Sequence, residues 1–312
     1  MDKLELTAII HTCNSAAVLE RALISLSWVP ERLVVDMAST DGTIEIATRL
    51  ATRILHADPA PRVDGIRDRY VEEATGTWVL VIDSDEWLAA DAGDEIFRLI
   101  REQGDRFDAF AIPRFNYVGE QLLRGGLWYP DNQVRLFRKG AVSWSDTNHG
   151  APQVFGNRLL ELVPPDCVHI HHQNYSNLRD VIERQLHYAL TERYDQDAQS
   201  FSFSDYIAKA HQCLVLRSDP ESDGDLSQAL ALIMAWDVLM RGLIHWDGLQ
   251  PRPALDFQAV LPPASRDVAS WRLALKKWTA SRYPLLFHLR RIRRRLHSII
   301  SRVMRPRPPV GE

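Results

Sequence analysis

Short apolar runs alternate with helical patterns through the first hundred residues, and this alternation constrains the fold more than any other feature. Residues 6–10, 32–36, 53–55 and 78–82 are apolar runs of strand length, in part β-branched. Between the first two runs, apolar residues recur at helical spacing over 18–26. Strands that alternate with helices form parallel βαβ units. We therefore predict an α/β fold with a doubly wound sheet.

Polar residues stand where these strands end. Thr12 and Asn14 follow the first strand, Asp36 ends the second, and Asp83 and Asp85 follow the fourth. In doubly wound sheets, ligands bind beyond the carboxyl ends of the strands. We therefore expect these side chains to converge on one crevice, and this is the central prediction from the sequence.

Asp83 and Asp85 form an Asp-x-Asp pair directly after a buried strand. Carboxylate oxygens are the ligands that Mg²⁺ prefers, and this ion keeps positions open for substrate phosphates. A cation bound here would neutralise charge on a leaving diphosphate. The alternative is that the pair only begins a turn and caps a helix, which is the ordinary meaning of an isolated Asp-x-Asp.

The remainder of the chain has three further regions. Residues 107–168 are rich in strand patterns, and apolar residues at helical spacing follow from Ser176. Residues 218–225 are polar and predict a loop. The apolar stretch 226–246 is interrupted by charged residues, which favours a buried helix over a membrane span. We assign 1–200 to the α/β domain, 201–270 to a helical extension and 271–312 to a basic amphipathic tail.

The cysteines and the N-terminus indicate a cytoplasmic protein. Cys13, Cys167 and Cys213 are an odd number with no CxxC pair, so a disulfide framework or a structural zinc site is not expected. The first five residues carry acidic side chains where a signal peptide carries basic ones, so no export signal is expected.

Charge is separated along the chain. Residues 272–312 hold 12 Lys and Arg against one acid, while the rest holds 25 against 40. On a helix over 285–305, leucine and isoleucine form a stripe with arginines around it, a pattern typical of attachment to an anionic membrane surface. Packing of this helix on the acidic domain is a close alternative. Nucleic-acid binding ranks below both, because aromatic interleaving and a base-reading fold are absent.

Several segments share their order and residue types with one known family. They are Thr7–Asn14, Val34–Thr43, Arg67-Asp68 ahead of Gly76, Ala74–Asp85, Gly126–Arg138 and the segment from His172 to Tyr188. Together they resemble the family 2 nucleotide-sugar glycosyltransferases, which have the Rossmann-like GT-A fold with a mixed sheet. The block from Gly126 is similar to the branch of lipopolysaccharide-core glucosyltransferases. The resemblance covers roughly residues 5–195.

The resemblance implies a nucleotide-diphosphate sugar donor, by preference a UDP-sugar. Thr12, Asn14 and Asp36 would hold the nucleotide base, with Arg67 close to it. Asp83 would contact the ribose or the metal. The acceptor would be a glycan, a lipid-linked group or a protein side chain, and transfer would invert the anomeric configuration.

The resemblance also implies metal ligands and a base. Asp85 would bind Mn²⁺ or Mg²⁺ directly, and His172 would be a further ligand or a diphosphate contact. His169 and His171 lie close to His172 in the sequence, so any one of the three histidines could be the functional one. Asp131 is our candidate for the general base that deprotonates the acceptor hydroxyl.

The chain departs from the family pattern at several positions. Met37 replaces a second aspartate, Cys13 replaces an aromatic residue, and Asp68 stands where Asn is usual. Gly150 stands where the branch has a glutamate, so Asp131 or Asp146 would have to serve as the base.

Two of the candidate side chains have ordinary structural alternatives. Asp131 could instead pair with Arg135 or Arg138. Trp128 could fill the core rather than stack on a sugar.

Three other functional classes are alternatives to a glycosyltransferase. A nucleotidyltransferase needs a glycine-rich phosphate loop, and residues 12–16 contain no glycine. A phosphatase needs a hydroxyl residue and a lysine shortly after the aspartates, and Glu86-Trp87 do not fit. A non-catalytic scaffold that binds nucleotide-sugar or glycan remains the alternative to an enzyme.

Overall fold

The computed structural model describes residues 5–59, 63–144, 152–192, 194 and 201–249. The described elements belong to one compact unit, Met1–Gln250. The predicted tail, with its membrane-binding stripe over 285–305, lies outside the described residues.

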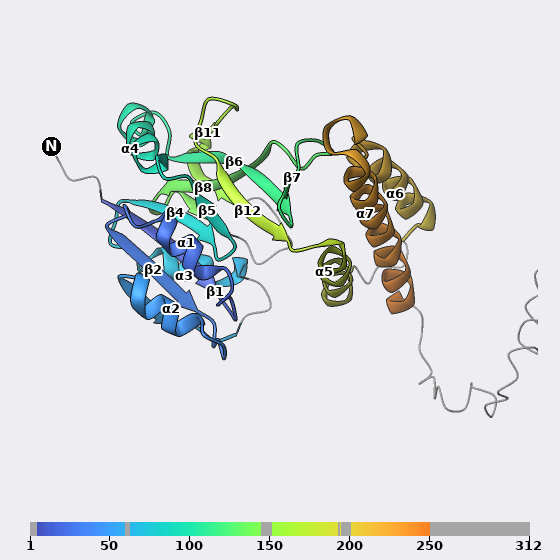
Figure 1. The fold of residues 1–312 in the computed structure, drawn as a ribbon, viewed down its shortest axis with the longest axis horizontal. Helices are drawn as coiled ribbons and strands as arrows, with labels where there is room; N and C mark the ends of the chain where they lie inside the picture. The colour runs from blue at the N-terminus through green and yellow to red at the C-terminus, as the bar shows by residue number, and fades with distance from the viewer. Residues whose placement is uncertain (1–4, 60–62, 145–151, 193, 195–200, 250–312) are drawn as a thin grey trace, which may run out of the picture. The chain divides into compact units, whose positions relative to one another are not determined.

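Within the described residues, ten strands form one mixed sheet and two form a separate ribbon (Figure 1). The strand order is β3-β2-β1-β4-β8-β6-β12-β5, and β7 and β11 also pair with β6. The strands are β1 (Leu6–Thr12), β2 (Glu31–Asp36), β3 (Arg53–His56), β4 (Trp78–Asp83), β5 (Glu86–Leu88), β6 (Ala109–Val118), β7 (Gln121–Leu122), β8 (Asp131–Arg138), β9 (Val142–Ser143), β10 (Gln153–Val154), β11 (Leu159–Glu161) and β12 (Ile170–Tyr175).

Seven α-helices and one 3-10 turn lie within the described residues. They are α1 (Leu19–Ser25), α2 (Thr43–Leu50), α3 (Asp64–Val71), α4 (Ala92–Gln103), the turn Phe155–Asn157, α5 (Leu178–Thr191), α6 (Phe203–Arg217) and α7 (Pro220–Leu249).

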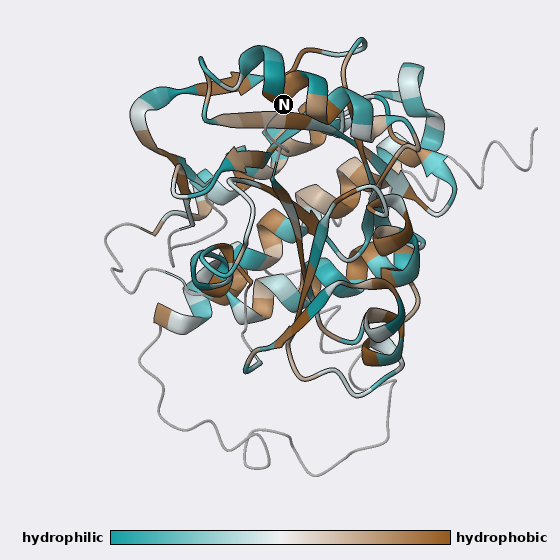
Figure 2. Cartoon of the chain, turned by 90° about the vertical axis from the view of Figure 1, so that its left-hand side faces the viewer, coloured by the Kyte–Doolittle hydropathy of each residue, from teal (hydrophilic) through white to brown (hydrophobic). Residues whose placement is uncertain are grey.

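The four strands β3, β2, β1 and β4 are parallel; β1, β2 and β4 are largely buried on both faces, and β3 is only partly buried. Apolar residues of α1, α2 and α4 pack in the core on one face, and those of α3 pack on the other. Figure 2 shows the central strands in hydrophobic colours between these helices. A parallel sheet needs cover on both faces, which explains the continuous apolar runs in the sequence. The predicted doubly wound α/β fold is confirmed.

Gly76 allows the chain to enter β4 closely against β1. A Cβ atom at this position would lie 2.7 Å from the carbonyl oxygen of Glu5 and 2.8 Å from the amide nitrogen of Thr7. The Thr7 hydroxyl accepts a hydrogen bond from the Gly76 amide at 2.9 Å. The approach of the two backbones therefore requires glycine.

The helices α5, α6 and α7 form the C-terminal part of this unit. α6 and α7 lie side by side, and α7 also contacts α5 (Figure 1). Leu230 of α7 and Val181 of α5 share a small core with Trp128, which is buried. Trp128 is therefore a core residue, which was the alternative to a role in stacking on a sugar. Buried Asp223 accepts backbone hydrogen bonds from Arg124 and Gly125, which joins α7 to the β7–β8 loop.

Two predictions for this part need correction. The loop predicted over 218–225 is wrong in part, because α7 begins at Pro220 and is only interrupted at Gly224, whose φ of 60° lies in the left-handed region. Proline is tolerated in the first turn of a helix, and glycine readily adopts positive φ, so the polar segment 218–225 can be largely helical.

The apolar helix predicted over 226–246 is present but buried on one side only. Between 229 and 246 every exposed residue is apolar, namely Leu232, Trp236, Leu239, Leu243 and Trp246. Among the described residues, α7 is the one helix long and apolar enough to cross a membrane, by length and composition alone.

Candidate active site

The carboxyl ends of β1, β2 and β4 bring three predicted residues to one edge of the sheet. Thr12 pairs in register with Asp36, and His11 pairs with Asp83. Thr12 and Asp36 are buried, and the Thr12 hydroxyl and one oxygen of Asp36 have no hydrogen-bond partner among the described residues. Buried polar groups are normally satisfied, so these two atoms mark a place where a ligand could bind.

Asn14 shapes the rim of this place. Its backbone has a φ of 49°, a left-handed conformation that asparagine tolerates better than most residues. Its side-chain oxygen accepts a hydrogen bond from the Thr40 backbone amide at 2.8 Å, and its backbone amide donates a hydrogen bond to the Ser39 hydroxyl. Ser39 in turn donates its amide to Asp36 at 3.1 Å. Asn14 therefore holds the loop after β2 against Asp36.

Asp83 lies between two arginines. One oxygen accepts from Arg67 Nη2 at 2.7 Å and the other from Arg135 Nη2. Burial alone would raise the pKa of Asp83, but Arg135 and Arg67 outweigh it, so the pKa lies well below the ordinary value. Asp83 is therefore a carboxylate whose two oxygens already bind cations of the protein.

Glu86 connects Asp83 to a second ion pair that the sequence did not reveal. Its side chain is fully buried and accepts from Arg114 and Arg135, each at 2.9 Å. Its other oxygen accepts from the Asp83 amide at 2.9 Å. Arg114 continues to Asp131, at 2.6 Å from Nη2. Three arginines and three carboxylates thus form one ionic network, in which Arg67, Glu86 and Arg135 are buried.

Asp131 is an integral part of this network. Its Oδ2 accepts from Arg114 and from the Asn116 amide group at 2.9 Å, and its Oδ1 accepts from Gln133 at 2.7 Å. Burial would raise the pKa of Asp131, but Arg114 and these hydrogen bonds outweigh it and the pKa is lowered. The alternative pairing with Arg135 or Arg138 is wrong, because the partner is Arg114.

His172 and Asp85 form a separate pair beside the network. His172 Nε2 lies 3.7 Å from Asp85 Oδ2. The pairing of β12 with β5, with His172 opposite Glu86, and the hydrogen bond from the Gln173 amide to the Asp85 carbonyl hold the two residues together. Both side chains are partly exposed, so a ligand could reach them.

Asn116 orients His172. The Asn116 Nδ2 group donates to Asp131 and to the Trp128 carbonyl, so its Oδ1 faces His172 Nδ1 at 2.7 Å. Because an amide oxygen only accepts, Nδ1 carries a proton, and Nε2 is the ring atom that faces Asp85. This arrangement is the one that supports a histidine as a metal ligand.

The other two histidines have different partners. His169 bonds to the Cys167 carbonyl and the Tyr129 hydroxyl, and His171 bonds to the Tyr117 hydroxyl. Of the three histidines, His172 is the one whose ring nitrogen faces Asp85 within the described part of the chain, so it is placed best for a ligand role.

A divalent cation fits the Asp85–His172 pair. One carboxylate oxygen and the Nε2 atom face each other, and Mn²⁺ and Mg²⁺ readily complete their shell with water and phosphate oxygens. No group of three or more His, Cys, Asp or Glu with metal-binding geometry occurs among the described residues. The pair would therefore make an open site that relies on ligands from outside the protein.

His11 is a further buried group that the sequence did not single out. Both ring nitrogens lack a hydrogen-bond partner within the described part of the chain, and Tyr70 packs edge-on against the ring. Burial, and after it the charge of Arg67, lowers the pKa of His11 to about 3. His11 is therefore neutral at physiological pH, directly beside the ionic network.

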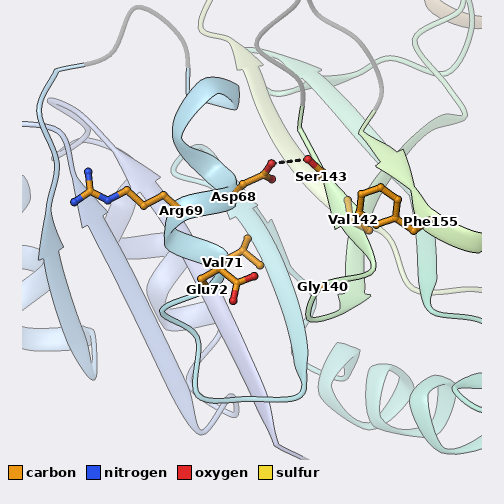
Figure 3. Close-up of a pocket in the computed structure, with 8 residues that line it drawn as sticks. All are labelled: Asp68, Arg69, Val71, Glu72, Gly140, Val142, Ser143 and Phe155. Atoms are coloured by element: carbon orange, nitrogen blue, oxygen red, sulfur yellow. Dashed lines mark hydrogen bonds between the residues drawn. The ribbon is translucent and has the colours of Figure 1, made fainter.

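A pocket of about 420 Å³ lies between α3 and the β8–β9 region (Figure 3). Its lining contains Asp68, whose carboxylate accepts from the Ser143 hydroxyl at 2.6 Å and from the Trp144 amide at 2.9 Å. The lining includes none of the strand-end residues. Asp68 therefore ties β9 to α3, and the pocket is separate from the candidate site.

Comparisons with known proteins agree with this arrangement. The family described as glycosyl transferase family 2 matches residues 7–155. A TPR repeat-containing protein of Synechococcus elongatus is 36% identical over 126 residues, which is 40% of this chain and 29% of that protein. An uncharacterized glycosyltransferase of Rickettsia bellii is 31% identical over 146 residues, which is 46% of this chain and 49% of that protein.

The chain thus spans about half or less of the length of these relatives. Among solved structures, S. aureus TarS 1-349 in complex with UDP-GlcNAc overlaps 80% of this chain and 93% of that chain, with 14% identity and a TM-score of 0.44.

The matched segment, 7–155, contains the ends of β1, β2 and β4 and the whole ionic network. The order of the motifs in the sequence and the family match agree. The chain thus contains a segment, residues 7–155, that matches glycosyl transferase family 2.

Proposed function

We propose that this protein transfers a sugar from a nucleotide-diphosphate donor, with UDP as the nucleotide, to a hydroxyl of a glycan or glycolipid. Transfer would invert the anomeric carbon, since the acceptor hydroxyl attacks opposite the leaving diphosphate. The observation that carries the proposal is the Asp85–His172 pair beside the strand ends, with His172 Nε2 3.7 Å from the carboxylate and Nδ1 bonded to Asn116.

The unpartnered oxygens of Thr12 and Asp36 support a nucleotide base at the strand ends. The free oxygen of Asp36 can accept the imide N–H of uracil, and the Thr12 hydroxyl can donate to a carbonyl of the same ring. Asn14 would act indirectly, by holding Ser39 and Thr40 in place. Arg67 would lie close to the nucleotide, fixed by Asp83.

Asp85 and His172 would hold Mn²⁺ or Mg²⁺. The cation, when bound, would neutralise the charge that develops on the leaving diphosphate. Asp83 would orient the arginines of the network rather than bind the metal, because both of its oxygens are occupied by Arg67 and Arg135.

For Asp131 we propose a positioning role in place of the general base that the sequence suggested. A carboxylate with a lowered pKa and four hydrogen bonds is a weaker base. Asp131 holds Asn116, and Asn116 holds His172. The other carboxylate considered for the base, Asp146, lies outside the described residues, as does Gly150.

We propose that the protein works in the cytoplasm, at the inner face of the membrane when its acceptor is lipid-linked. The basic segment 285–305 would provide the attachment through its arginines. The lipopolysaccharide-core branch remains part of the proposal through the block from Gly126 to Arg138.

A thermal-shift panel tests the donor. Nucleoside diphosphates and sugar nucleotides are added with and without Mn²⁺, and selective stabilisation by uridine compounds is expected. The stabilisation should depend on the cation and should be lost in Asp85→Ala but kept in Asp94→Ala, an acidic residue of α4 outside the site. Equal stabilisation by all nucleotides, or none by any, would contradict the proposal.

The non-catalytic scaffold is distinguished by chemistry. An enzyme of this kind is expected to hydrolyse the donor slowly in the absence of its acceptor, with water as the nucleophile, in a cation-dependent way. Binding without any such turnover, in the presence of Mn²⁺ and a panel of glycan acceptors, would favour the scaffold.

A further inference from the structure

The helix α7 has an inverted distribution of polar and apolar side chains. Between residues 229 and 246 its exposed side chains are all apolar, with exposed fractions from 37% for Trp236 to 60% for Leu232. Over the same stretch Asp237 is 5% exposed and His245 is 7% exposed. A helix on the surface of a water-soluble protein has the opposite arrangement, with its polar residues outward. The outer side of α7 is therefore suited to an apolar medium.

The polar residues of this stretch have partners on the neighbouring helices. Asp237 accepts a hydrogen bond from Arg241 Nε at 2.8 Å, and Arg241 also pairs with Glu192 directly after α5. His245 Nδ1 lies 3.0 Å from the Tyr206 hydroxyl of α6. The side of α7 that faces α5 and α6 therefore carries the polar groups of this stretch.

The exposed apolar residues of α7 form one continuous face. They recur at intervals of four and three residues, which places them along one side of the helix over about 21 Å. The face continues onto α6, where the centroid of the Phe203 ring lies 5.9 Å from that of the Trp246 ring. This outer face consists of Phe203, Leu232, Trp236, Leu239, Leu243 and Trp246.

The composition of the outer face favours a lipid bilayer over a protein partner. Water-soluble monomers rarely expose a continuous apolar patch unless it meets a partner or a membrane. Protein interfaces surround an apolar centre with hydrogen-bonding groups, whereas the side chains of the outer face carry no hydrogen-bonding group except the indole N–H of tryptophan. Tryptophan is enriched where a membrane meets water, because one end of its ring is apolar and the other polar.

The charge of the chain also favours a bilayer. Residues 272–312, which follow α7 in the sequence, hold 12 Lys and Arg against one acid. Each basic residue close to an anionic lipid surface contributes to attraction. This excess of positive charge therefore complements anionic lipid headgroups.

A crossing of the bilayer by α7 is not favoured, although the helix is long and apolar enough by length and composition. The helix α6 lies beside it, and the exposed residues of α6 include Lys209, His211 and Gln212. A charged side chain at the centre of a bilayer is costly. A pair of helices that is apolar on one side only therefore suits the surface of a bilayer.

We propose that the outer face docks onto an anionic lipid bilayer, with its leucine and tryptophan side chains at the boundary between headgroups and acyl chains. Attachment of a peripheral protein becomes stronger with the apolar area that it buries and with its attraction to anionic lipids. The outer face supplies the apolar contribution, and the arginines of 285–305 supply the electrostatic one. The proposal goes beyond the transfer reaction, because it concerns where the protein binds and not what it transfers.

Vesicles of phosphatidylglycerol and phosphatidylethanolamine are the probe. The full-length protein is sedimented with them at low and at high salt, without any nucleotide. Because salt screens the attraction of the arginines but not the apolar contact, part of the bound fraction should persist at high salt. The double variant Leu239→Gln/Leu243→Gln should lower this salt-resistant binding by about tenfold. Val163→Gln is the matched control, since Val163 is an apolar residue of the β11–β12 loop that is 78% exposed.

Tryptophan fluorescence provides a second measurement. Lipids with brominated acyl chains should quench the fluorescence of the bound protein, and the quenching should be smaller in Trp236→Phe than in the wild type. Trp28→Phe is the control, because Trp28 packs edge-on against Phe97 at the core of the sheet. This variant should be quenched as strongly as the wild type.

Three results would overturn the proposal. They are a wild type that does not bind the vesicles at either salt concentration, equal salt-resistant binding by the wild type and the double variant, and equal quenching in Trp236→Phe and the wild type. Sedimentation velocity tests a different occupant. A wild-type dimer that becomes a monomer in the double variant, with vesicle binding unchanged, would assign the outer face to a second copy of the chain.

The transferase proposal is tested separately. The outer face contains none of the residues of the candidate active site, so the double variant should bind the donor as the wild type does in the thermal-shift panel. Vesicle binding is measured without donor, so membrane docking stands if the donor does not bind. Donor binding without any vesicle binding would overturn the docking proposal alone.

Discussion

Replacement of Asn116 by alanine tests the arrangement through which His172 would bind a metal. Asn116 is 1% exposed and contacts three partners, namely His172, Asp131 and the Trp128 carbonyl. In Asn116→Ala, His172 loses the acceptor that keeps the proton on Nδ1. The ring can then rotate or change tautomer, and Nε2 is no longer held toward Asp85.

The expected loss follows from the size of such contacts. Removal of a group that orients a metal-bound histidine typically lowers metal affinity by about 10- to 100-fold, which corresponds to roughly 1.4 to 2.7 kcal/mol. Stability should fall as well, by about 1 to 3 kcal/mol, because the Trp128 carbonyl loses its donor in a buried position. Asp131 keeps Arg114, so the network itself should persist.

Mn²⁺ binding in the presence of UDP can be measured from the electron paramagnetic resonance signal of the free ion. Asn132→Ala is the matched control, since Asn132 is an asparagine of β8 whose amide makes one long hydrogen bond of 3.4 Å to the Leu162 carbonyl. We expect weaker Mn²⁺ binding in Asn116→Ala only. Equal dissociation constants in both variants would refute the reasoning and remove His172 from the site.

Three further predictions concern stability. Asp83→Asn removes the negative charge that pairs with Arg67 and Arg135. Because Asp83 is 30% exposed, we expect the free energy of unfolding to fall by about 3 kcal/mol, seen as a lower urea midpoint. An unchanged midpoint would contradict the role of the network in stability. Because the pKa of His11 is about 3 in the folded protein, only the unfolded state binds a proton on this residue between pH 6.5 and about 3. The free energy of unfolding should therefore decrease as the pH is lowered through this window, by up to about 1.4 kcal/mol per pH unit. His11→Phe should flatten that dependence, and parallel curves for both proteins would argue against it. Gly76→Ala should lower the free energy of unfolding by about 1 to 3 kcal/mol, because the added Cβ atom overpacks the site. The comparison is Gly140→Ala, where an added Cβ atom meets nothing within 4 Å and only the φ of 80° causes strain.

The convergence of the strand ends could be predicted because it depends on local pattern alone. Parallel strands place their carboxyl ends at one edge of a sheet, so Thr12, Asp36 and Asp83 had to come together once the βαβ pattern was identified. The contacts that these side chains make could not be predicted in the same way. Whether a carboxylate faces a ligand or an arginine depends on strands that lie far away in the sequence.

Arg135 shows why the network was missed. β6 and β8 pair Phe110 with Leu136 but Ala111 with Val134, so Arg135 is the extra residue of a bulge. A bulge redirects a side chain, and here it directs the guanidinium to Asp83 and Glu86. Alternation of polar and apolar residues along a strand cannot reveal such a shift. For the same reason the sequence suggested Arg135 or Arg138 as the partner of Asp131, and Arg114 was overlooked.

The helix α7 illustrates a different limit. Its apolar composition correctly predicted a helix, but composition does not say what covers each side. One side packs in the core around Leu230, and the other shows Leu232, Trp236 and Leu239 to solvent within the described unit. The pattern that identifies a helix therefore leaves its environment undetermined.

The ionic network has a consequence for the order in which ligands arrive. Its three guanidinium groups cancel its three carboxylates, so they offer an incoming divalent ion no surplus negative charge. Asp85 and His172 supply only two donor atoms, and an ion with no other help would keep most of its hydration water. Nucleotide and ion should therefore load together as one complex, and each should raise the apparent affinity of the other by the same factor.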